Sequence, residues 1–205
     1  MVKALFIEAG HGKSAYGLLK DVGACSRFGD NNYQERDIAL QLARRVIAIL
    51  STKKELKDVL IQGVGVETAA AITSKMKFVN TVIRENRFPM EDCLGIAIHL
   101  NASTNSKPRG MEIWHQKNGK SKVFGEHLVR AWLDYKILPL RPVPLISTAK
   151  HRYRKLYIDD AYCPYVLIEA GFISNPEDVK AVTGDYDRVA ECISHGIMEH
   201  LRADF

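Results

Sequence analysis

Residues 165–182, YVLIEAGFISNPEDVKAV, place a short apolar run directly before a polar turn and a helix start. The apolar run ends at Glu169, so we expect a buried strand over 165–169. Gly171 lets the chain turn tightly after this strand. Asn175 and Pro176 are typical of a helix cap and first turn, which predicts a helix over 175–182. The stretch is therefore a strand followed by a helix, the repeating unit of an α/β fold.

The same alternation of apolar runs and helical periodicity extends outward over the rest of the chain. Further strands are expected at 3–8, 57–62, 94–100 and 110–115, and further helices at 35–50, 67–86, 121–136 and 186–201. Residues 9–34 are expected to form a long, polar, Gly-rich loop, and residues 137–156, with three prolines, to be irregular. Strands alternating with helices predict a three-layer α/β domain with a mostly parallel sheet. No linker or internal repeat interrupts the 205 residues, so we expect a single domain over 1–205.

Composition and charge exclude several classes of protein. A hydrophobic content of 46% is enough for an ordinary core, and the absence of any run of ~20 apolar residues argues against insertion into a membrane. The net charge of +5 would attract a polyanion such as nucleic acid or an acidic cell-wall polymer. Because charges of both signs are interspersed, no nucleic-acid partner is expected. The basic stretch 151–155 is interpreted as a solvated loop, with contact to an anionic substrate group as the alternative.

Neither the cysteines nor the first residues indicate an extracellular disulfide scaffold. Cys25, Cys93, Cys163 and Cys192 form no C-x-x-C pair, so we expect reduced thiols and no structural zinc site. The chain enters a strand-like run at once, without a charged leader and long apolar stretch. We therefore expect a protein made in the cytosol, or a mature form without its leader. The oligomeric state is not determined by the sequence.

Four residues stand where an α/β sheet places its ligands. His11, His99 and Glu169 each follow a short apolar run, and Glu35 opens an amphipathic helix. Residues just past the carboxyl ends of strands line the ligand crevice, so these four are expected to meet. Two imidazoles and one carboxylate are a known ligand set for catalytic zinc, with the fourth position left to water. A second carboxylate beside that water can act as a general base.

Each of these residues also has a structural interpretation. His99 alone fits a hydrogen-bonded core histidine, and Asn101 is a candidate to orient its free ring nitrogen. Glu35 alone fits a favourable charge at a helix start, with Asn32 as the N-cap. Glu169 is harder to explain structurally, because a carboxylate ending a buried strand needs a metal, a donor or a water. Glycines on both sides of His11 favour a ligand role, because they let the backbone turn sharply.

Other chemistry-bearing residues are weaker candidates. Glu8 is expected on the same side as His11, where it could support that ring. Glu112 and His115 have odd spacing on one strand and are expected to face opposite sides. Cys163 lies six residues before Glu169, but it precedes Pro164 at a strand entry, which is the wrong end for the crevice. A nucleophilic Cys163 remains a distant alternative.

Five motifs together resemble the zinc-dependent N-acetylmuramoyl-L-alanine amidases of the group called amidase family 3. In chain order they are IEAGHGK at 7–13, ERDIALQLARRV at 35–46, AIHLNAS at 97–103, PRGMEIW at 108–114 and the opening stretch at 165–182. Lys77 and Asn80 also look like the basic residue and the asparagine that the family carries on the helix before the second histidine. Glu8 departs from the Asp that is common in the family, and Lys13 stands where a second Gly is common.

The resemblance implies a fold, a reaction and a role for each matching residue. His11, Glu35 and His99 would bind Zn²⁺ and Glu169 would be the catalytic glutamate, on a six-stranded, largely parallel sheet. The reaction would cleave the amide between the lactyl group of N-acetylmuramic acid and L-alanine in peptidoglycan.

The substrate contacts and the setting of the enzyme are expectations of the same kind. Lys13, Asn101, Arg109 and Arg154 are candidate substrate-binding residues, the three basic ones toward stem-peptide carboxylates. The absence of an extra helical insertion suggests an open site. With no leader expected, the chain resembles a phage endolysin released through a holin, or a mother-cell or autolytic amidase, acting on the cell wall. The alternatives are another zinc peptidase or deacylase on the same fold, and a non-catalytic wall-binding module.

Overall fold

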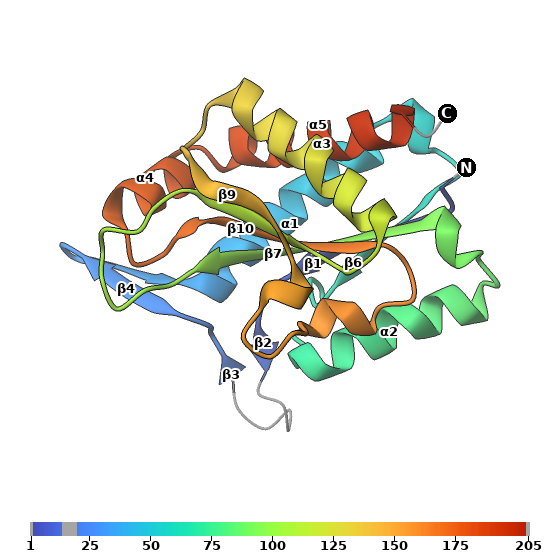
Figure 1. Cartoon of the computed structure of the whole chain (residues 1–205), viewed down its shortest axis with the longest axis horizontal. Helices are drawn as coiled ribbons and strands as arrows, with labels where there is room; N and C mark the ends of the chain where they lie inside the picture. The colour runs from blue at the N-terminus through green and yellow to red at the C-terminus, as the bar shows by residue number, and fades with distance from the viewer. Residues whose placement is uncertain (1, 14–19, 204–205) are drawn as a thin grey trace.

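A six-stranded sheet forms the centre of the computed structural model, which describes residues 2–13 and 20–203 (Figure 1). In spatial order its strands are β6 (Leu60–Val64), β1 (Ala4–Ala9), β7 (Cys93–Asn101), β10 (Tyr165–Phe172), β8 (Met111–His115) and β9 (Leu140–Ser147). Neighbouring strands are parallel except β10 and β8, which are antiparallel. The prediction of a mostly parallel, six-stranded sheet is confirmed.

Helices cover both faces of this sheet, as the alternating pattern predicts. They are α1 (Glu35–Ser51), α2 (Ile72–Glu85), α3 (Gly119–Tyr135), α4 (Pro176–Gly184) and α5 (Tyr186–Ala203), with short 3₁₀ turns η1 (Lys54–Leu56), η2 (Met90–Asp92), η3 (Thr148–Lys150) and η4 (Tyr157–Asp160). In Figure 1, α1, α3 and α5 lie on one side of the sheet and α2 lies on the other. No helix in the described part of the chain is long and apolar enough to cross a membrane.

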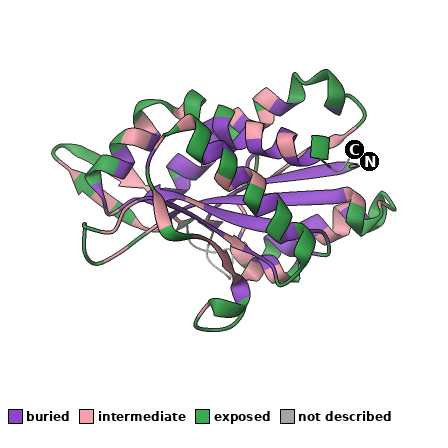
Figure 2. Cartoon of the chain, turned by 45° about the horizontal axis from the view of Figure 1, so that its top comes forward, coloured by how far each residue is buried: buried purple, intermediate pink, exposed green. Residues whose placement is uncertain are grey.

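Period-two alternation divides the core into two parts. In β7, Ile96 and Ile98 pack in the larger core with α1, α3 and α5, whereas Ala97 packs in the smaller core with α2 and η4. The central strands are buried along most of their length, as Figure 2 shows in purple. His99 is two residues beyond Ala97, so it shares the face of the smaller core. Near the carboxyl ends of the strands, that face carries the polar residues described below.

Two loop predictions need correction. Residues 137–156 are not irregular throughout, because they contain β9, in which Pro142 and Pro144 are tolerated on an edge strand. The polar segment 9–34 contains four short strands instead of a structureless loop, in its described part. These are β2 (Gly12–Lys13) paired with β3 (Lys20–Asp21), and β4 (Cys25–Phe28) paired with β5 (Asn31–Gln34).

Three element boundaries differ from the prediction by at least three residues. The strand expected at 57–62 is β6, which begins at Leu60. The second helix begins at Ile72 instead of residue 67. The last strand continues to Phe172, so Glu169 lies inside it. A register shift against β7 falls between Glu169 and Phe172, and Gly171 has a φ of 145° there. The sheet therefore becomes irregular immediately after Glu169.

Candidate active site

The backbone around His11 is strained and tightly packed. His11 itself has a φ of 57°, which is uncommon for a residue with a side chain, and Gly12 follows with a φ of 133°. A Cβ added at Gly10 would lie 2.7 Å from two atoms of the His99 ring. The glycines on both sides therefore allow the chain to turn and His99 to approach the backbone closely.

Glu35 is the first residue of α1, and its carboxylate points into the protein. The carboxylate accepts hydrogen bonds from the backbone N–H of Ala24 (3.0 Å) and of Leu100 (3.2 Å). Asn32 is not the N-cap; Gln34 occupies that position and makes no side-chain cap bond. The N–H of Glu35 is bound by the Ala24 carbonyl instead. The acidic side chain is therefore available for a function other than capping.

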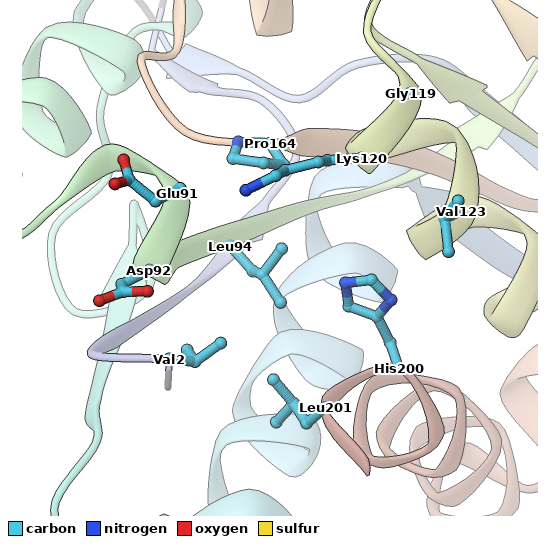
Figure 3. Close-up of a pocket in the computed structure, with 10 residues that line it drawn as sticks. All are labelled: Val2, Glu91, Asp92, Leu94, Gly119, Lys120, Val123, Pro164, His200 and Leu201. Carbon is cyan, nitrogen blue, oxygen red and sulfur yellow. The ribbon is translucent and has the colours of Figure 1, made fainter. Parts of the chain in front are cut away.

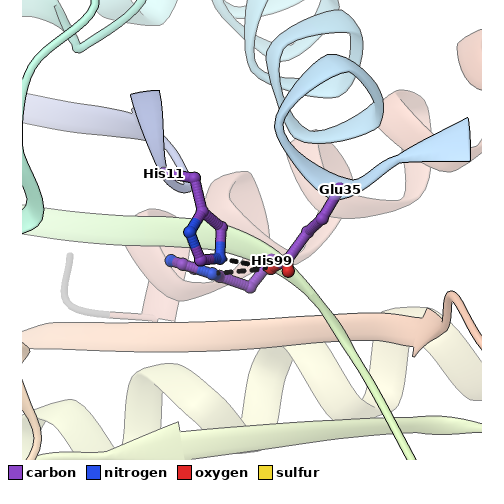
Figure 4. A group of neighbouring side chains, drawn as sticks. All are labelled: His11, Glu35 and His99. Atoms are coloured by element: carbon purple, nitrogen blue, oxygen red, sulfur yellow. Dashed lines mark hydrogen bonds and ion pairs between the residues drawn. The ribbon is translucent and has the colours of Figure 1, made fainter. Parts of the chain in front are cut away.

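His11, Glu35 and His99 meet at one point near the carboxyl ends of β1 and β7 (Figure 4). Glu35 Oε1 lies 3.0 Å from His11 Nε2 and 3.0 Å from His99 Nδ1. The three ligand atoms lie within 4.8 Å of one another, the one such His/Cys/Asp/Glu cluster among residues 2–13 and 20–203. Two imidazole nitrogens and a carboxylate oxygen match a catalytic zinc ligand set that leaves a fourth position for water. The donors therefore fit a divalent cation.

The electrostatics of the cluster also fit a cation. Burial opposes ionisation of Glu35, but hydrogen bonds and charge from His11 and His99 outweigh it and lower the pKa of Glu35 far below its usual range. Burial likewise disfavours the charged His11 ring, but Glu35 and Asp21 outweigh it and raise the pKa of His11. The carboxylate is thus balanced by imidazole protons, which a bound metal ion would displace.

Asp21 contacts Nδ1 of His11, the ring nitrogen that does not face Glu35. The sequence analysis did not predict this residue. Its two carboxylate oxygens lie 3.1 and 3.0 Å from His11 Nδ1. The pairing of Gly12 with Asp21 between β2 and β3 brings the two residues together. A carboxylate that accepts from Nδ1–H leaves Nε2 free to bind a metal, as is usual for metal-binding histidines. Glu8, the residue predicted for this support, instead contacts Tyr157, Tyr165 and Lys75.

Glu169 lies beside His99 in the sheet. The register pairs Glu169 with His99 on β7 and with Glu112 on β8, so the three side chains share one face. Glu169 Oε2 is buried and has no hydrogen-bond partner among the described residues. Burial raises the pKa of Glu169 well above its usual range, and the charges of Glu35 and Glu112 raise it further. An unpaired buried carboxyl group needs a partner, which a substrate or water can supply.

Glu112 lies on β8, on the side of Glu169 opposite to His99. Its Oε1 accepts from Asn101 Nδ2 (3.0 Å) and Trp114 Nε1 (3.3 Å), and its Oε2 lies 3.5 Å from Arg141 Nε. Asn101 therefore does not orient His99, because its amide binds Glu112. Neither Glu112 nor Arg141 was a predicted site residue. Glu112 could have been predicted, because it lies on the strand expected at 110–115. Arg141 could not, because it lies in the segment expected to be irregular.

The predicted basic contacts lie elsewhere or are not described. Arg109 forms ion pairs with Glu177 and Asp178 at the start of α4. Arg154 is exposed, and its backbone N–H donates to the His151 carbonyl. The Lys13 side chain lies outside the described residues.

The structure also places two further residues of the sequence analysis, Lys77 and Cys163. Lys77 is exposed, whereas Lys75 on the same helix is fully buried and donates to the Ala9 carbonyl. The Cys163 thiol is buried before the start of β10, and burial raises its pKa far above the usual value. A protonated, inaccessible thiol does not act as a nucleophile.

A separate cavity lies at the opposite end of the sheet (Figure 3). It has a volume of about 610 Å³, and its walls include Leu94 at the start of β7, Pro164 before β10, and His200 of α5. Leu94 and His99 are separated by roughly 16 Å along the strand, at about 3.3 Å per residue. The cavity is therefore separate from the His11, Glu35 and His99 cluster.

Comparison with known proteins gives a consistent result. The family model described as N-acetylmuramoyl-L-alanine amidase matches residues 5–199. A protein of Buchnera aphidicola subsp. Baizongia pistaciae, described as an amidase of this kind, is 28% identical over 197 residues, covering 83% of this chain and 82% of the relative.

Solved structures show the same fold. The crystal structure of an N-acetylmuramoyl-L-alanine amidase from Clostridium difficile 630 aligns with a TM-score of 0.77 at 24% identity, covering 100% of this chain and 99% of that one. The catalytic domain of the amidase CwlV from Bacillus (Paenibacillus) polymyxa var. colistinus aligns with a TM-score of 0.72 at 24% identity, covering 98% and 99%.

Proposed function

Because the chain belongs to the N-acetylmuramoyl-L-alanine amidase family, we propose that it hydrolyses the amide between N-acetylmuramic acid and L-alanine in a zinc-dependent reaction. His11, Glu35 and His99 are the proposed zinc ligands, and Glu169 is the proposed catalytic residue. The observation that carries this proposal is the convergence of three donor atoms within 4.8 Å, beside a buried carboxylate with an unpaired oxygen. Peptidoglycan is the proposed substrate, with residues 1–205 as one catalytic domain.

Backbone and side-chain contacts hold the proposed ligand residues in place. Two backbone N–H groups hold the Glu35 carboxylate, and Asp21 holds the His11 ring. A Cβ at Gly23 would lie 2.6 Å from both Glu35 Oε2 and His11 Cδ2, so the chain passes directly against the cluster. Such preorganisation favours one geometry of the donors. When bound, Zn²⁺ supplies Lewis acidity toward the amide carbonyl and lowers the pKa of a bound water.

We propose that Glu169 moves the proton in this reaction. Its carboxylate, in which Oε2 is buried without a hydrogen-bond partner among the described residues, can accept a hydrogen bond from the attacking water and then its proton. The leaving group is the amine of L-alanine, which must gain a proton before it departs. The raised pKa of Glu169, caused by burial and then by Glu35 and Glu112, suits a group that first takes up the proton and then returns it.

Analysis of the products tests the bond that is cleaved. Purified peptidoglycan digested with the enzyme is expected to gain amino termini on L-alanine, while the glycan strands stay intact and no new reducing ends form. A rival zinc peptidase would release amino acids or create termini at other stem-peptide positions, and a deacetylase would release acetate. Either of those products, without new L-alanine termini, would overturn the proposed specificity. Binding to cell-wall sacculi without any cleavage would instead indicate a non-catalytic module.

The rim residues remain proposals for substrate binding. Asn101 lies on the same face as His99, and its amide already contacts Glu112. Lys13 is the last residue of β2, Arg154 belongs to a loop, and Arg109 would have to exchange its ion pairs with α4 for a substrate carboxylate. We therefore propose Asn101 and Arg154 as more accessible contacts than Arg109, and we keep Lys13 as a further proposed contact. The cell wall is the proposed place of action.

A further inference from the structure

The second ring nitrogen of His99 is in contact with a tyrosine from a distant part of the chain. His99 Nδ1 faces Glu35, whereas His99 Nε2 lies 3.0 Å from the hydroxyl of Tyr157. Tyr157 opens η4, which packs against α2 on the same side of the sheet as His99. The second ring nitrogen of His99 therefore contacts the phenol of Tyr157, whereas the second ring nitrogen of His11 contacts the carboxylate of Asp21.

The hydrogen of this hydroxyl has a defined direction. Tyr157 donates to Glu8 Oε1, 2.7 Å away. Glu8 is fully buried, and Lys75 Nζ lies 3.2 Å from the same oxygen in a fully buried ion pair. An ionised carboxylate only accepts hydrogen bonds, so the hydroxyl hydrogen must point to Glu8. The Tyr157 oxygen is then left as an acceptor toward His99 Nε2.

Glu8 is held in place from a second strand. Tyr165 on β10 donates to Glu8 Oε2 at 3.2 Å, although β7 separates β10 from β1. Tyr165 crosses β7 at Gly95, where a Cβ would lie only 1.9 Å from its ring. Both oxygens of Glu8 are thus occupied by donors, which keeps the carboxylate oriented toward Tyr157.

Tyr157 is fixed by the packing of its own turn. Asn80 on α2 donates to the Asp160 carbonyl at 2.8 Å, and Gln116 donates to the Ile158 carbonyl at 2.9 Å. Ile158 has no exposed surface. Contacts with α2 and with the segment after β8 therefore hold the turn that carries the Tyr157 phenol next to His99.

From these contacts we propose that Tyr157 is a positioning residue that fixes the tautomer of His99 through Glu8 and Lys75. Nε2 must carry a hydrogen to meet the Tyr157 oxygen, so Nδ1 is the nitrogen whose lone pair would bind a metal ion held together with Glu35 and His11. The proposal rests on the proposed function, in which His99 binds zinc through Nδ1. It assigns to Glu8 and Lys75 the role of orienting the Tyr157 hydroxyl.

Two matched phenylalanine variants test this role. Tyr157→Phe removes the hydroxyl between Glu8 and His99, whereas Tyr165→Phe removes a hydroxyl that binds Glu8 but does not contact His99. Zinc affinity is measured by competition with a chromogenic chelator, with circular dichroism to monitor folding. Tyr157→Phe is expected to weaken zinc binding by about 10- to 100-fold, the usual cost of losing a partner of a metal-binding histidine. Tyr165→Phe is expected to change it by less than about threefold, because the His99 contact stays.

The outcomes separate this proposal from the proposed function. Wild-type protein that binds zinc, with a folded Tyr157→Phe variant of equal affinity, would overturn the positioning role alone. Wild-type protein that binds no zinc would overturn both. Nitrogen NMR of the zinc-loaded wild-type protein tests the tautomer even if the variant does not fold. The hydrogen is expected on His99 Nε2, and a hydrogen on Nδ1 would contradict the proposal.

Discussion

Replacing Glu169 by glutamine is expected to lower peptidoglycan hydrolysis by at least about 100-fold, the lower end of what general acid–base catalysis contributes. The amide side chain keeps the size of the carboxyl group but cannot take up a proton from water. Because Glu169 is not one of the three clustered donors, zinc content is expected to stay at the wild-type level. Turnover on purified peptidoglycan and metal analysis of the same sample check both parts.

A matched control is Glu126→Gln on the exposed face of α3, where the side chain pairs with Lys122 at the surface. It makes the same chemical change and is expected to leave turnover unchanged. Substantial activity in Glu169→Gln, or in the shorter Glu169→Ala, would rule out the proposed proton transfer. Loss of zinc together with activity would show that Glu169 acts on the metal centre instead.

Removing the carboxylate of Glu35 is expected to abolish both zinc binding and hydrolysis. In Glu35→Ala the cluster keeps two imidazoles but loses the oxygen that lies 3.0 Å from each of them. A direct ligand is expected to matter more than a supporting residue, so zinc affinity should fall by more than about 100-fold. Metal content after dialysis, and a chelator competition, measure the loss.

Asp37→Ala is the control for this change. Asp37 is an exposed acid in the same first turn of α1, so it contributes similarly to the helix start but supplies no atom to the cluster. The control is expected to retain zinc and activity. A Glu35→Ala variant that holds zinc as tightly as wild type would exclude Glu35 as a ligand and would favour its interpretation as a helix-start charge.

The strands and helices were largely predictable because their residues follow simple periods. Ile96 and Ile98 alternate with Ala97 across the two faces of β7, as the apolar run suggested. The edge strand β9 was missed because proline normally ends a strand. At the edge of a sheet, the missing N–H of Pro142 can face solvent, so the ladder to β8 survives.

The proposed ligands were predictable, but their supporting residues were not. His11 and His99 follow apolar runs, a signal that a single sequence contains. Asp21 and Tyr157 contact the two rings only because a short strand pair and a 3₁₀ turn bring distant segments together. No local pattern encodes such pairings.

Helical spacing could have separated Lys75 from Lys77. Lys75 is four residues before the buried Val79, and so on its face of α2, whereas Lys77 points to solvent. The buried lysine that meets Glu8 was therefore within reach of sequence reasoning.

Zinc content measured together with activity on purified peptidoglycan tests the proposed metal centre most directly. The protein is assayed as isolated, after chelation, and after zinc is restored. We predict one zinc per chain, lost on chelation together with lytic activity, and activity regained with zinc. Absence of bound metal, with activity unchanged by chelation, would contradict a zinc mechanism built on His11, Glu35 and His99.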